Sequence, residues 1–230
     1  MRRKALILAC DTKDLSTSYD AANWNDFLTS DKGGAWEDNE IITLKNPVKA
    51  DITSKLHSIQ SSFTEYLLII FAGHGGINKI TNEQVFSINK HEDILLKDLC
   101  DIVNKELIIA DTCSSFFIES ESRAYLQKSF ASLNSSRSLY RVKYNERIST
   151  VAAGTTYLIS SGINQTAQDD SDGGKFTKIF LSCARESSEK IYDIKTAYDD
   201  VVKIMPSTQQ PRLSNGRRMN ASSYPIAVNL

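Results

Sequence analysis

The sequence predicts an α/β fold in which a mainly parallel six-stranded sheet carries helices on both faces. Two observations indicate this class. Short runs of apolar, β-branched residues recur along the chain, and such runs are typical of strands buried in a parallel sheet. Segments with helical periodicity alternate with these runs, and this alternation implies right-handed crossovers that cover both faces of one sheet.

The predicted elements follow one another along most of the chain. The apolar runs predict strands at 6–9, 40–44, 66–72, 107–110, 150–153 and 226–228. The helical patterns predict helices at 21–28, 49–62, 95–103, 176–183 and 194–205. A polar turn that ends at Pro47 leads into the second helix. The stretch 114–149 interrupts the alternation because it is polar and rich in serine.

Size and composition fit a single domain that spans residues 1–230. A chain of this length can bury a sizeable core. Its formal net charge of −1 argues against nucleic-acid and membrane-surface partners, and no apolar run approaches the roughly 18 residues of a membrane span. The first apolar run, 5–9, is shorter than the roughly 7 to 15 residues that a signal peptide needs.

The four cysteines are scattered along the chain and show no zinc-ligand or redox spacing. They are Cys10, Cys100, Cys113 and Cys183. A disulfide framework is therefore not expected. A reducing cytoplasm is the expected location, which also suits a reactive thiol.

One histidine and one cysteine each follow an apolar run that is predicted to be a strand. His74 comes shortly after the third strand and Cys113 shortly after the fourth. Because parallel sheets present working groups beyond the carboxyl ends of their strands, we expect these two side chains to meet. An imidazole can take the thiol proton and later protonate a leaving amine, as in Cys–His acyl transfer. The other histidines, His57 and His91, lie in a helical segment and a polar stretch.

Backbone N–H groups near this pair are candidates for an oxyanion hole. Glycine tolerates positive φ and allows close backbone approach, so Gly75 can turn its N–H toward a substrate carbonyl. The N–H of Cys113 would supply the second donor.

Two aspartates are candidates for a substrate pocket. Asp111 stands two residues before Cys113 on an extended segment, so the two side chains would point to the same side. A carboxylate there would pair with a Lys or Arg side chain of the substrate. Asp11, just past the first strand, is a candidate for a second acid in this pocket.

The His74-Gly75 and Asp111-Thr112-Cys113 motifs resemble those of the caspase-like clan of cysteine peptidases, which includes caspases, metacaspases and paracaspases. Members carry His-Gly after the third strand and the catalytic Cys after the fourth. The stretch 172–180 is similar to the Gly-Gly-x-Phe-Thr helix opening of bacterial members, and 209–211 is similar to their late Gln-x-Pro element. The resemblance implies a caspase-like three-layer sandwich of bacterial type.

The Asp-x-Cys pattern is that of metacaspases and paracaspases, whose members cleave after Arg or Lys. Caspases that cleave after aspartate carry Gln two residues before the nucleophile, where this chain has Asp111. The resemblance thus implies a cysteine endopeptidase with a His74–Cys113 dyad, acting on proteins or peptides. Ser114-Ser115 departs from the usual Ser-Gly that follows the nucleophile.

The resemblance also implies routes of activation: a protein partner, calcium or self-cleavage. The segment equivalent to 114–149 carries activation loops in caspase-like peptidases. Its candidate cleavage sites here are Arg123, Lys128, Arg137, Arg141, Lys143 and Arg147. A partly helical surface excursion is the competing interpretation. Some metacaspases need calcium, but the acidic stretch 168–174 lacks the twelfth-position glutamate of an EF-hand, so no metal ligand is assigned.

Other classes of function stay open at this stage. A caspase-like domain can serve as a signalling or binding module with little intrinsic activity. A doubly wound domain can instead bind a small molecule in a crevice lined by His74 and Cys113. Taken singly, a histidine after a strand is often a structural turn residue, and a buried cysteine is often a small hydrophobe.

Overall fold

The computed structural model describes residues 1–11, 17–117, 137–170, 172–215 and 223–230. Its centre is a six-stranded sheet with the order β13-β9-β7-β3-β1-β2. The strands are β1 (Arg3–Cys10), β2 (Ile41–Lys45), β3 (Tyr66–Gly73), β7 (Lys105–Asp111), β9 (Gly154–Ile159) and β13 (Arg212–Ser214). All neighbours pair in parallel except β13, which is antiparallel to β9. The predicted mainly parallel sheet is confirmed.

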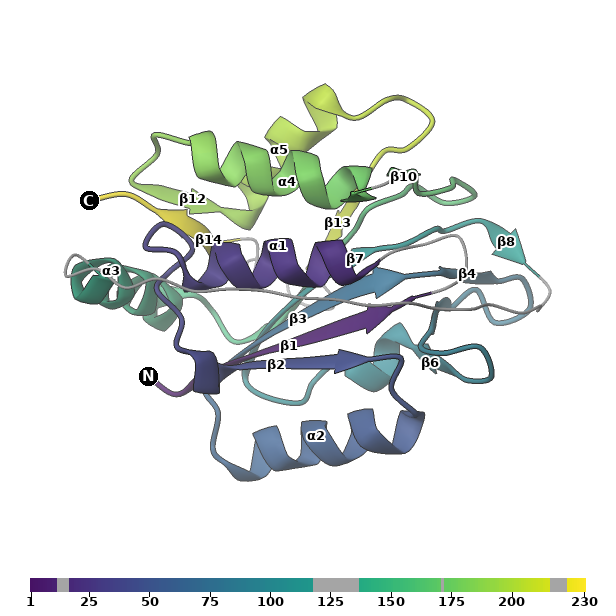
Figure 1. Ribbon diagram of the computed structural model, residues 1–230, viewed down its shortest axis with the longest axis horizontal. Helices are drawn as coiled ribbons and strands as arrows, with labels where there is room; N and C mark the ends of the chain where they lie inside the picture. The colour runs from purple at the N-terminus through teal and green to yellow at the C-terminus, as the bar shows by residue number, and fades with distance from the viewer. Residues whose placement is uncertain (12–16, 118–136, 171, 216–222) are drawn as a thin grey trace.

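Helices cover both faces of this sheet, as Figure 1 shows. One face carries α1 (Thr17–Thr29), α3 (Arg137–Thr150), α4 (Lys175–Glu186) and α5 (Ile194–Ile204), and the other carries α2 (Lys49–Ser61). Alternate residues of a strand point to opposite faces. In β1, Ile7 packs in the core under α1 while Leu6 and Leu8 pack in the core over α2. Both faces of the sheet are buried against apolar side chains, which explains why the strand sequences are continuously apolar.

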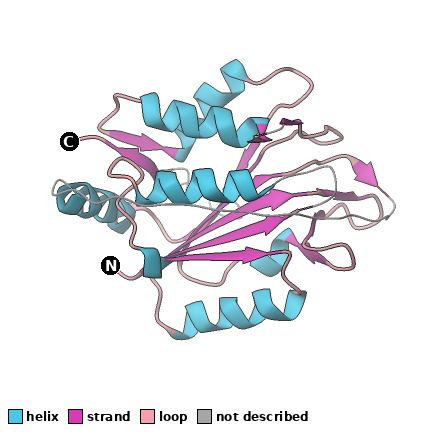
Figure 2. Cartoon of the chain, in the orientation of Figure 1, coloured by secondary structure: helices cyan, strands magenta, loops and turns pink. Residues whose placement is uncertain are grey.

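Smaller sheets extend the edges of the molecule (Figure 2). A four-stranded sheet of order β6-β5-β4-β8 contains β4 (Gly75–Asn78), β5 (Gln84–Ser87), β6 (Asp93–Leu95) and β8 (Phe116–Phe117). Two pairs complete the set: β10 (Asp169–Asp170) with β11 (Gly173–Gly174), and β12 (Ile191–Asp193) with β14 (Pro225–Val228). The predicted strand at 226–228 is therefore correct as a strand but lies outside the six-stranded sheet, whose sixth strand is β13.

The predicted helix at 95–103 is wrong. The segment contains only a short 3₁₀ helix, η2 (Leu96–Leu99). Beyond it, the Glu106 carboxylate accepts hydrogen bonds from the N–H groups of Asp101 and Val103, both at 2.7 Å. Asp101 also has a φ of 61°. A side chain thus satisfies the backbone donors that a helix would have used, and the chain turns into β7.

The predicted strand at 150–153 is also wrong. Helix α3 continues through Thr150, and β9 begins only at Gly154. The Lys105 ammonium donates to the carbonyls of Ile148 and Ser149, each at 2.8 Å. A lysine at the carboxyl end of a helix satisfies carbonyls that lack intrahelical partners, so the helix extends to this point.

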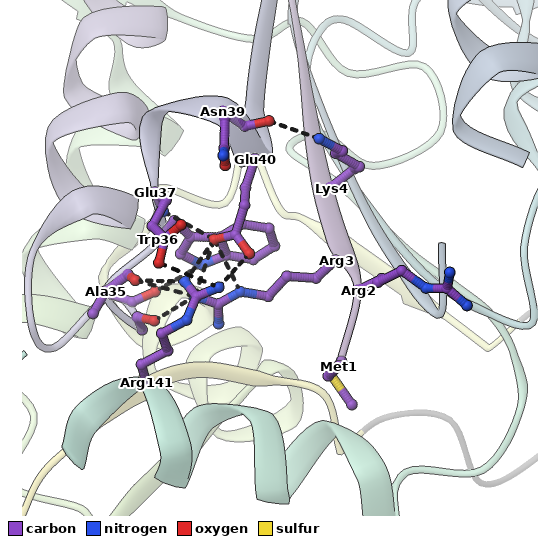
Figure 3. Close-up of polar contacts among 12 residues, drawn as sticks. Met1, Arg2, Arg3, Lys4, Ala35, Trp36, Glu37, Asn39, Glu40 and Arg141 are labelled. Atoms are coloured by element: carbon purple, nitrogen blue, oxygen red, sulfur yellow. Dashed lines mark hydrogen bonds and ion pairs between the residues drawn. The ribbon is translucent and has the colours of Figure 1, made fainter. Parts of the chain in front are cut away.

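A buried group of charges fixes the amino end of the sheet (Figure 3). Arg3 at the start of β1 and Arg141 of α3 both bond to Glu40, which ends the 3₁₀ helix η1 (Asp38–Glu40). The Arg3 guanidinium also lies 4.3 Å from the centre of the Trp36 ring. We call Arg3, Glu40 and Arg141 the paired cluster. It ties α3 to the sheet at the end opposite to His74 and Cys113.

No helix in the described ranges is long and apolar enough to cross a membrane.

Candidate active site

The carboxyl ends of β3 and β7 bring His74 and Cys113 to one edge of the sheet. The two strands pair in parallel with Ala72 opposite Asp111. His74 and Cys113 each follow two residues later, beyond a point where neighbouring strands lie about 4.8 Å apart. His74 is exposed and Cys113 is half-buried. The histidine and the cysteine therefore follow the ends of two adjacent parallel strands.

The Cys113 thiol contacts the segment that follows β9. Its Sγ accepts a hydrogen bond from Ala167 N at 3.3 Å, and the S–H points to Ala167 O at 3.9 Å. Burial raises the pKa of the Cys113 thiol, the Ala167 N–H partly opposes this, and the charge of Asp111 adds to the rise. The thiol is therefore protonated near neutral pH, so nucleophilic attack needs a base to take its proton.

The direction of the Cys113 N–H follows from the bonds on the preceding carbonyl. The Thr112 oxygen accepts hydrogen bonds from the hydroxyls of Ser160 and Ser161, at 3.1 and 2.8 Å. Because a trans peptide holds its C=O and N–H in opposite directions, the Cys113 N–H points away from both serines. Ser160 and Ser161 thus fix the orientation of one candidate oxyanion donor.

The Gly75 N–H is oriented by the small sheet. Ser87 N donates to His74 O, which makes Gly75 and Phe86 a non-hydrogen-bonded pair of the antiparallel ladder. The Gly75 N–H therefore points away from β5, to the same side as the Ile77 N–H, which bonds to Ser115 O. This side is that of the nucleophile loop, as an oxyanion donor requires.

The reason for glycine at this position differs from the expected one. Gly75 has no positive φ, since the described glycines in that region are Gly34, Gly154 and Gly173. Instead, a Cβ on Gly75 would lie 2.5 Å from both Thr112 Oγ1 and Val85 O. Close packing, and not a left-handed backbone, excludes a side chain here.

Asp111 lies buried at the amino end of α4 and interacts with a second buried acid, Asp20 of α1. Asp111 Oδ2 accepts from Thr177 N at 2.9 Å and from Thr177 Oγ1 at 2.8 Å, while Asp20 Oδ1 accepts from Gly174 N at 2.9 Å. A Cβ on Gly174 would lie 2.1 Å from Asp111 Oδ2, so only glycine permits this approach. We call Asp20 and Asp111 the acidic pair.

The acidic pair accepts hydrogen bonds from the backbone N–H groups of Gly174 and Thr177 and from the hydroxyls of Thr177 and Ser160. Burial and the charge of Asp111 raise the pKa of Asp20 to about 8, while the Gly174 N–H and Lys178 oppose the rise. Burial likewise raises the pKa of Asp111, against the bonds from Thr177, and Asp169 adds to the rise. Repulsion and desolvation outweigh the helix terminus, which by itself would favour ionised carboxylates.

Asp11 has a different environment from the one predicted. Its carboxylate accepts hydrogen bonds from Thr17 Oγ1 at 2.6 Å and Ser18 Oγ at 3.2 Å, at the start of α1. The acid of α1 that acts on Asp111 is Asp20. The sequence indicates that Asp20 is buried, because it lies four residues before Trp24 and therefore on the same apolar face of the helix.

Ser114 lies at the centre of a polar network. It is 0% exposed, and its Oγ bonds to Gln84 Oε1 at 3.1 Å and to Ser161 Oγ at 3.0 Å. Gln84 Nε2 in turn donates to the carbonyl of Cys113 at 3.2 Å. Ser114 is therefore a buried support for the nucleophile loop, and the departure from the usual Ser-Gly falls on Ser115. Sequence reasoning missed both Gln84 and Ser161, which carry no motif.

The two later motifs have defined structural roles. Helix α4 begins at Lys175, directly after the paired glycines, and its first turn holds the acidic pair. Gln209 is fully buried, accepts a hydrogen bond from Gln168 N at 2.9 Å and donates to Ser160 O at 3.3 Å. The late glutamine therefore connects the segment before β13 to the segment that contacts the thiol.

The candidate activation segment 114–149 is partly helical. Arg137, Arg141, Lys143 and Arg147 lie in α3, where each side chain bonds or pairs with another part of the fold. These four positions are therefore poor cleavage sites, because a protease binds extended chain. Arg123 and Lys128 lie outside the described residues.

The acidic stretch before α4 forms ordinary protein contacts. Asp169 and Asp170 make up β10, and Asp172 bonds to Lys178 at 2.6 Å. Within the described part of the chain, no group of three His, Cys, Asp or Glu residues is arranged to hold a metal ion.

Comparison with known proteins identifies the fold. A crystal structure of a protein from Geobacter sulfurreducens superposes with a TM-score of 0.65 and 15% identity, covering 100% of both chains. The crystal structure of caspase-1 from Spodoptera frugiperda superposes with a TM-score of 0.61 and 12% identity, over 93% of this chain and 86% of caspase-1. Neither a family model nor a curated protein sequence matches the chain. The chain thus has a caspase-like α/β sandwich fold.

Proposed function

We propose that this protein is a cysteine endopeptidase of the metacaspase or paracaspase type, which hydrolyses peptide bonds after Arg or Lys. The observation that carries the proposal is the acidic pair: buried Asp111, which ends β7 two residues before Cys113, and buried Asp20 of α1. Two buried acids whose pKa values are raised by burial are unfavourable in their ionised forms in the free protein. A guanidinium or ammonium of the substrate would supply a compensating positive charge.

The proposed chemistry is acyl transfer. His74 takes the proton of Cys113, and the thiolate attacks the scissile carbonyl carbon while the π electrons move to the oxygen. The N–H groups of Gly75 and Cys113 stabilise this oxyanion. As the tetrahedral species collapses, His74 protonates the leaving amine, and water then hydrolyses the thioester by the same steps.

The second acid of the pocket is assigned to Asp20 in place of Asp11. Asp11 is satisfied by two hydroxyls of α1, whereas Asp20 shares the first turn of α4 with Asp111. An asparagine could cap that helix at a lower desolvation cost than a carboxylate. Carboxylates at both positions therefore favour recognition of a basic side chain over a purely structural role.

A caspase-like signalling or binding module with little intrinsic activity is the second candidate. One observation favours it: both backbone groups of Ala167 contact the Cys113 thiol, which burial keeps protonated. A protein partner, calcium or self-cleavage would then have to move this segment before substrate reaches the thiol. The two candidates differ in the activity expected from the isolated protein.

The experiment that tests the proposal measures hydrolysis of matched fluorogenic peptides that end in Arg, Lys, Asp or Gln. It uses the wild type, Cys113→Ala and the control Cys100→Ala, whose thiol is half-buried and bonds to Leu96 O. Each protein is assayed with and without calcium. We expect Arg and Lys peptides to be cleaved by the wild type and by Cys100→Ala, and Cys113→Ala to lose at least about 10³-fold in turnover. Wild-type protein that is silent with every peptide would favour the signalling module.

A further inference from the structure

Arg212 of β13 is a half-buried cation behind the nucleophile loop. Burial lowers the pKa of its guanidinium, and no described Asp or Glu forms an ion pair with it. Removing a charge from water without an opposite charge is costly. A guanidinium in this position therefore lowers the stability of the folded protein unless its contacts compensate, and these contacts indicate another role.

The guanidinium donates to three acceptors from three separate segments. Its Nε donates to Ser161 O at 2.9 Å, and its Nη2 donates to Gln84 Oε1 at 3.0 Å and to Ser114 Oγ at 2.8 Å. These acceptors belong to the loop after β9, to β5 and to the nucleophile loop. The planar fork of an arginine can serve several acceptors in fixed directions, which a single hydroxyl with one proton cannot do.

Each of the three acceptors also holds the backbone around Cys113. Gln84 Nε2 donates to the Cys113 carbonyl at 3.2 Å, and Ser161 Oγ donates to the Thr112 carbonyl at 2.8 Å. Ser114 N donates to Gln165 O at 2.9 Å. The peptide units on both sides of the nucleophile are therefore held by groups that Arg212 or its neighbours position.

We propose that Arg212 is a positioning residue, which fixes the two peptide units around Cys113 through Gln84, Ser114 and Ser161. The inference rests on the proposed peptidase function, in which the Cys113 N–H must point at the developing oxyanion. Arg212 touches no reacting atom. It sets the direction of the Cys113 peptide, and a displacement of about 1 Å at such a donor can cost about a hundredfold in rate.

The first test compares Arg212→Met with Arg147→Met. Arg147 is a partly exposed arginine of α3 that pairs with Asp193 at 3.7 Å, remote from the nucleophile loop. We expect Arg212→Met to lower kcat for Arg peptides by about 10- to 100-fold, with KM and melting temperature unchanged, and Arg147→Met to leave kcat unchanged. A kcat for Arg212→Met within twofold of wild type would overturn the proposal. So would a loss of kcat that matches a loss of folded protein.

A double-mutant cycle tests the route through Gln84. Gln84→Met removes the donor to the Cys113 carbonyl and leaves Arg212 in place. If Arg212 acts through this amide, the double variant should be no slower than the slower single variant. Multiplicative losses would show that the two residues act independently, which contradicts the proposed route.

Amide hydrogen exchange separates this inference from the proposed function. We expect Arg212→Met to accelerate exchange in residues 112–116 and Arg147→Met to leave it unchanged. Wild-type protein that cleaves no peptide would refute the peptidase, while acceleration confined to 112–116 would still support the positioning role. Unchanged exchange at 112–116 in Arg212→Met would overturn the role whatever the activity.

Discussion

Buried charges gather at both ends of the central sheet, and the two groups differ in whether opposite charges meet. At the amino end, Glu40 lies between Arg3 and Arg141 (Figure 3). Burial alone would raise the pKa of Glu40, but the bonds from Arg141 and from Glu37 N outweigh it and the pKa is lowered. At the carboxyl end, burial and then the charge of Asp111 raise the pKa of Asp20 to about 8.

The difference separates a structural cluster from a candidate binding site. In the paired cluster, opposite charges meet, because the carboxylate receives bonds from both guanidinium groups and a backbone N–H. In the proposed function, a positive charge of the substrate compensates the acidic pair, whose pKa values burial raises. Perturbed acids of this kind concentrate at functional sites because the free protein carries an unfavourable arrangement that a ligand relieves. The comparison can be tested by neutralising one acid at each end.

The largest expected effect is loss of activity in Asp111→Asn. Removing one partner of a buried charge pair typically costs 2 to 5 kcal/mol, so kcat/KM for Arg peptides should fall by about 10³-fold. The Cys113 thiol should still react with iodoacetamide, since the dyad is intact. Peptide kinetics and alkylation rates check this, and an unchanged preference for Arg over Gln at P1 would remove Asp111 from the pocket.

Glu40→Gln should act on stability and not on activity. The change removes the carboxylate that pairs with the buried Arg3, while Arg141 keeps its pairing with Glu37 at 3.7 Å, and breaking a buried ion pair costs about 3 kcal/mol or more. Urea unfolding should show this loss, while kcat/KM of the folded protein stays at the wild-type value. A variant with unchanged stability would contradict the structural role of the paired cluster.

In contrast to Glu40→Gln, Asp20→Asn should raise the stability of the folded protein. The pKa of Asp20 rises from 3.8 to about 8 on folding, so the folded state keeps a proton that the unfolded state releases. This contribution to stability is full below pH 4 and is lost as pH rises toward 8. Asparagine cannot ionise and so avoids this loss, and Asp20→Asn should therefore be more stable than wild type at pH 8, by several kcal/mol.

The control for this prediction is the pH dependence itself. Between pH 5 and 8 the unfolding free energy of the wild type should decline more steeply than that of Asp20→Asn. Arg-peptide turnover should fall in the variant even as its stability rises. If the unfolding free energies of the two proteins change equally with pH, ionised Asp20 does not destabilise the folded protein, which contradicts the prediction.

The smallest expected effect is proton release on binding. A basic ligand that enters the acidic pair favours the ionised acids, so it should displace up to about one proton near pH 7. Calorimetric titration of Cys113→Ala with an Arg peptide, in buffers of different ionisation enthalpy, measures this number. Glu40→Gln in the same background should release the same amount, and zero release would place the ligand elsewhere.

Local patterns predicted the scaffold of the site. The apolar runs before His74 and Cys113 are strands β3 and β7, because a strand buried on both faces must be apolar throughout. The predictions failed where a distant side chain decided the backbone. Glu106 satisfies the amides that a helix over 95–103 would need, and Lys105 extends α3 past the point where a strand was expected.

The sequence by itself determined the alternating strands and helices and the two strand ends at which a histidine and a cysteine stand. It did so because period and burial are recorded in neighbouring residues. Only the tertiary structure decided which groups surround them. Asp20 meets the Gly174 amide across 154 positions, and Arg212 meets Gln84 across 128. Such contacts depend on how helices and strands pack in space, and no local pattern specifies a partner at that distance.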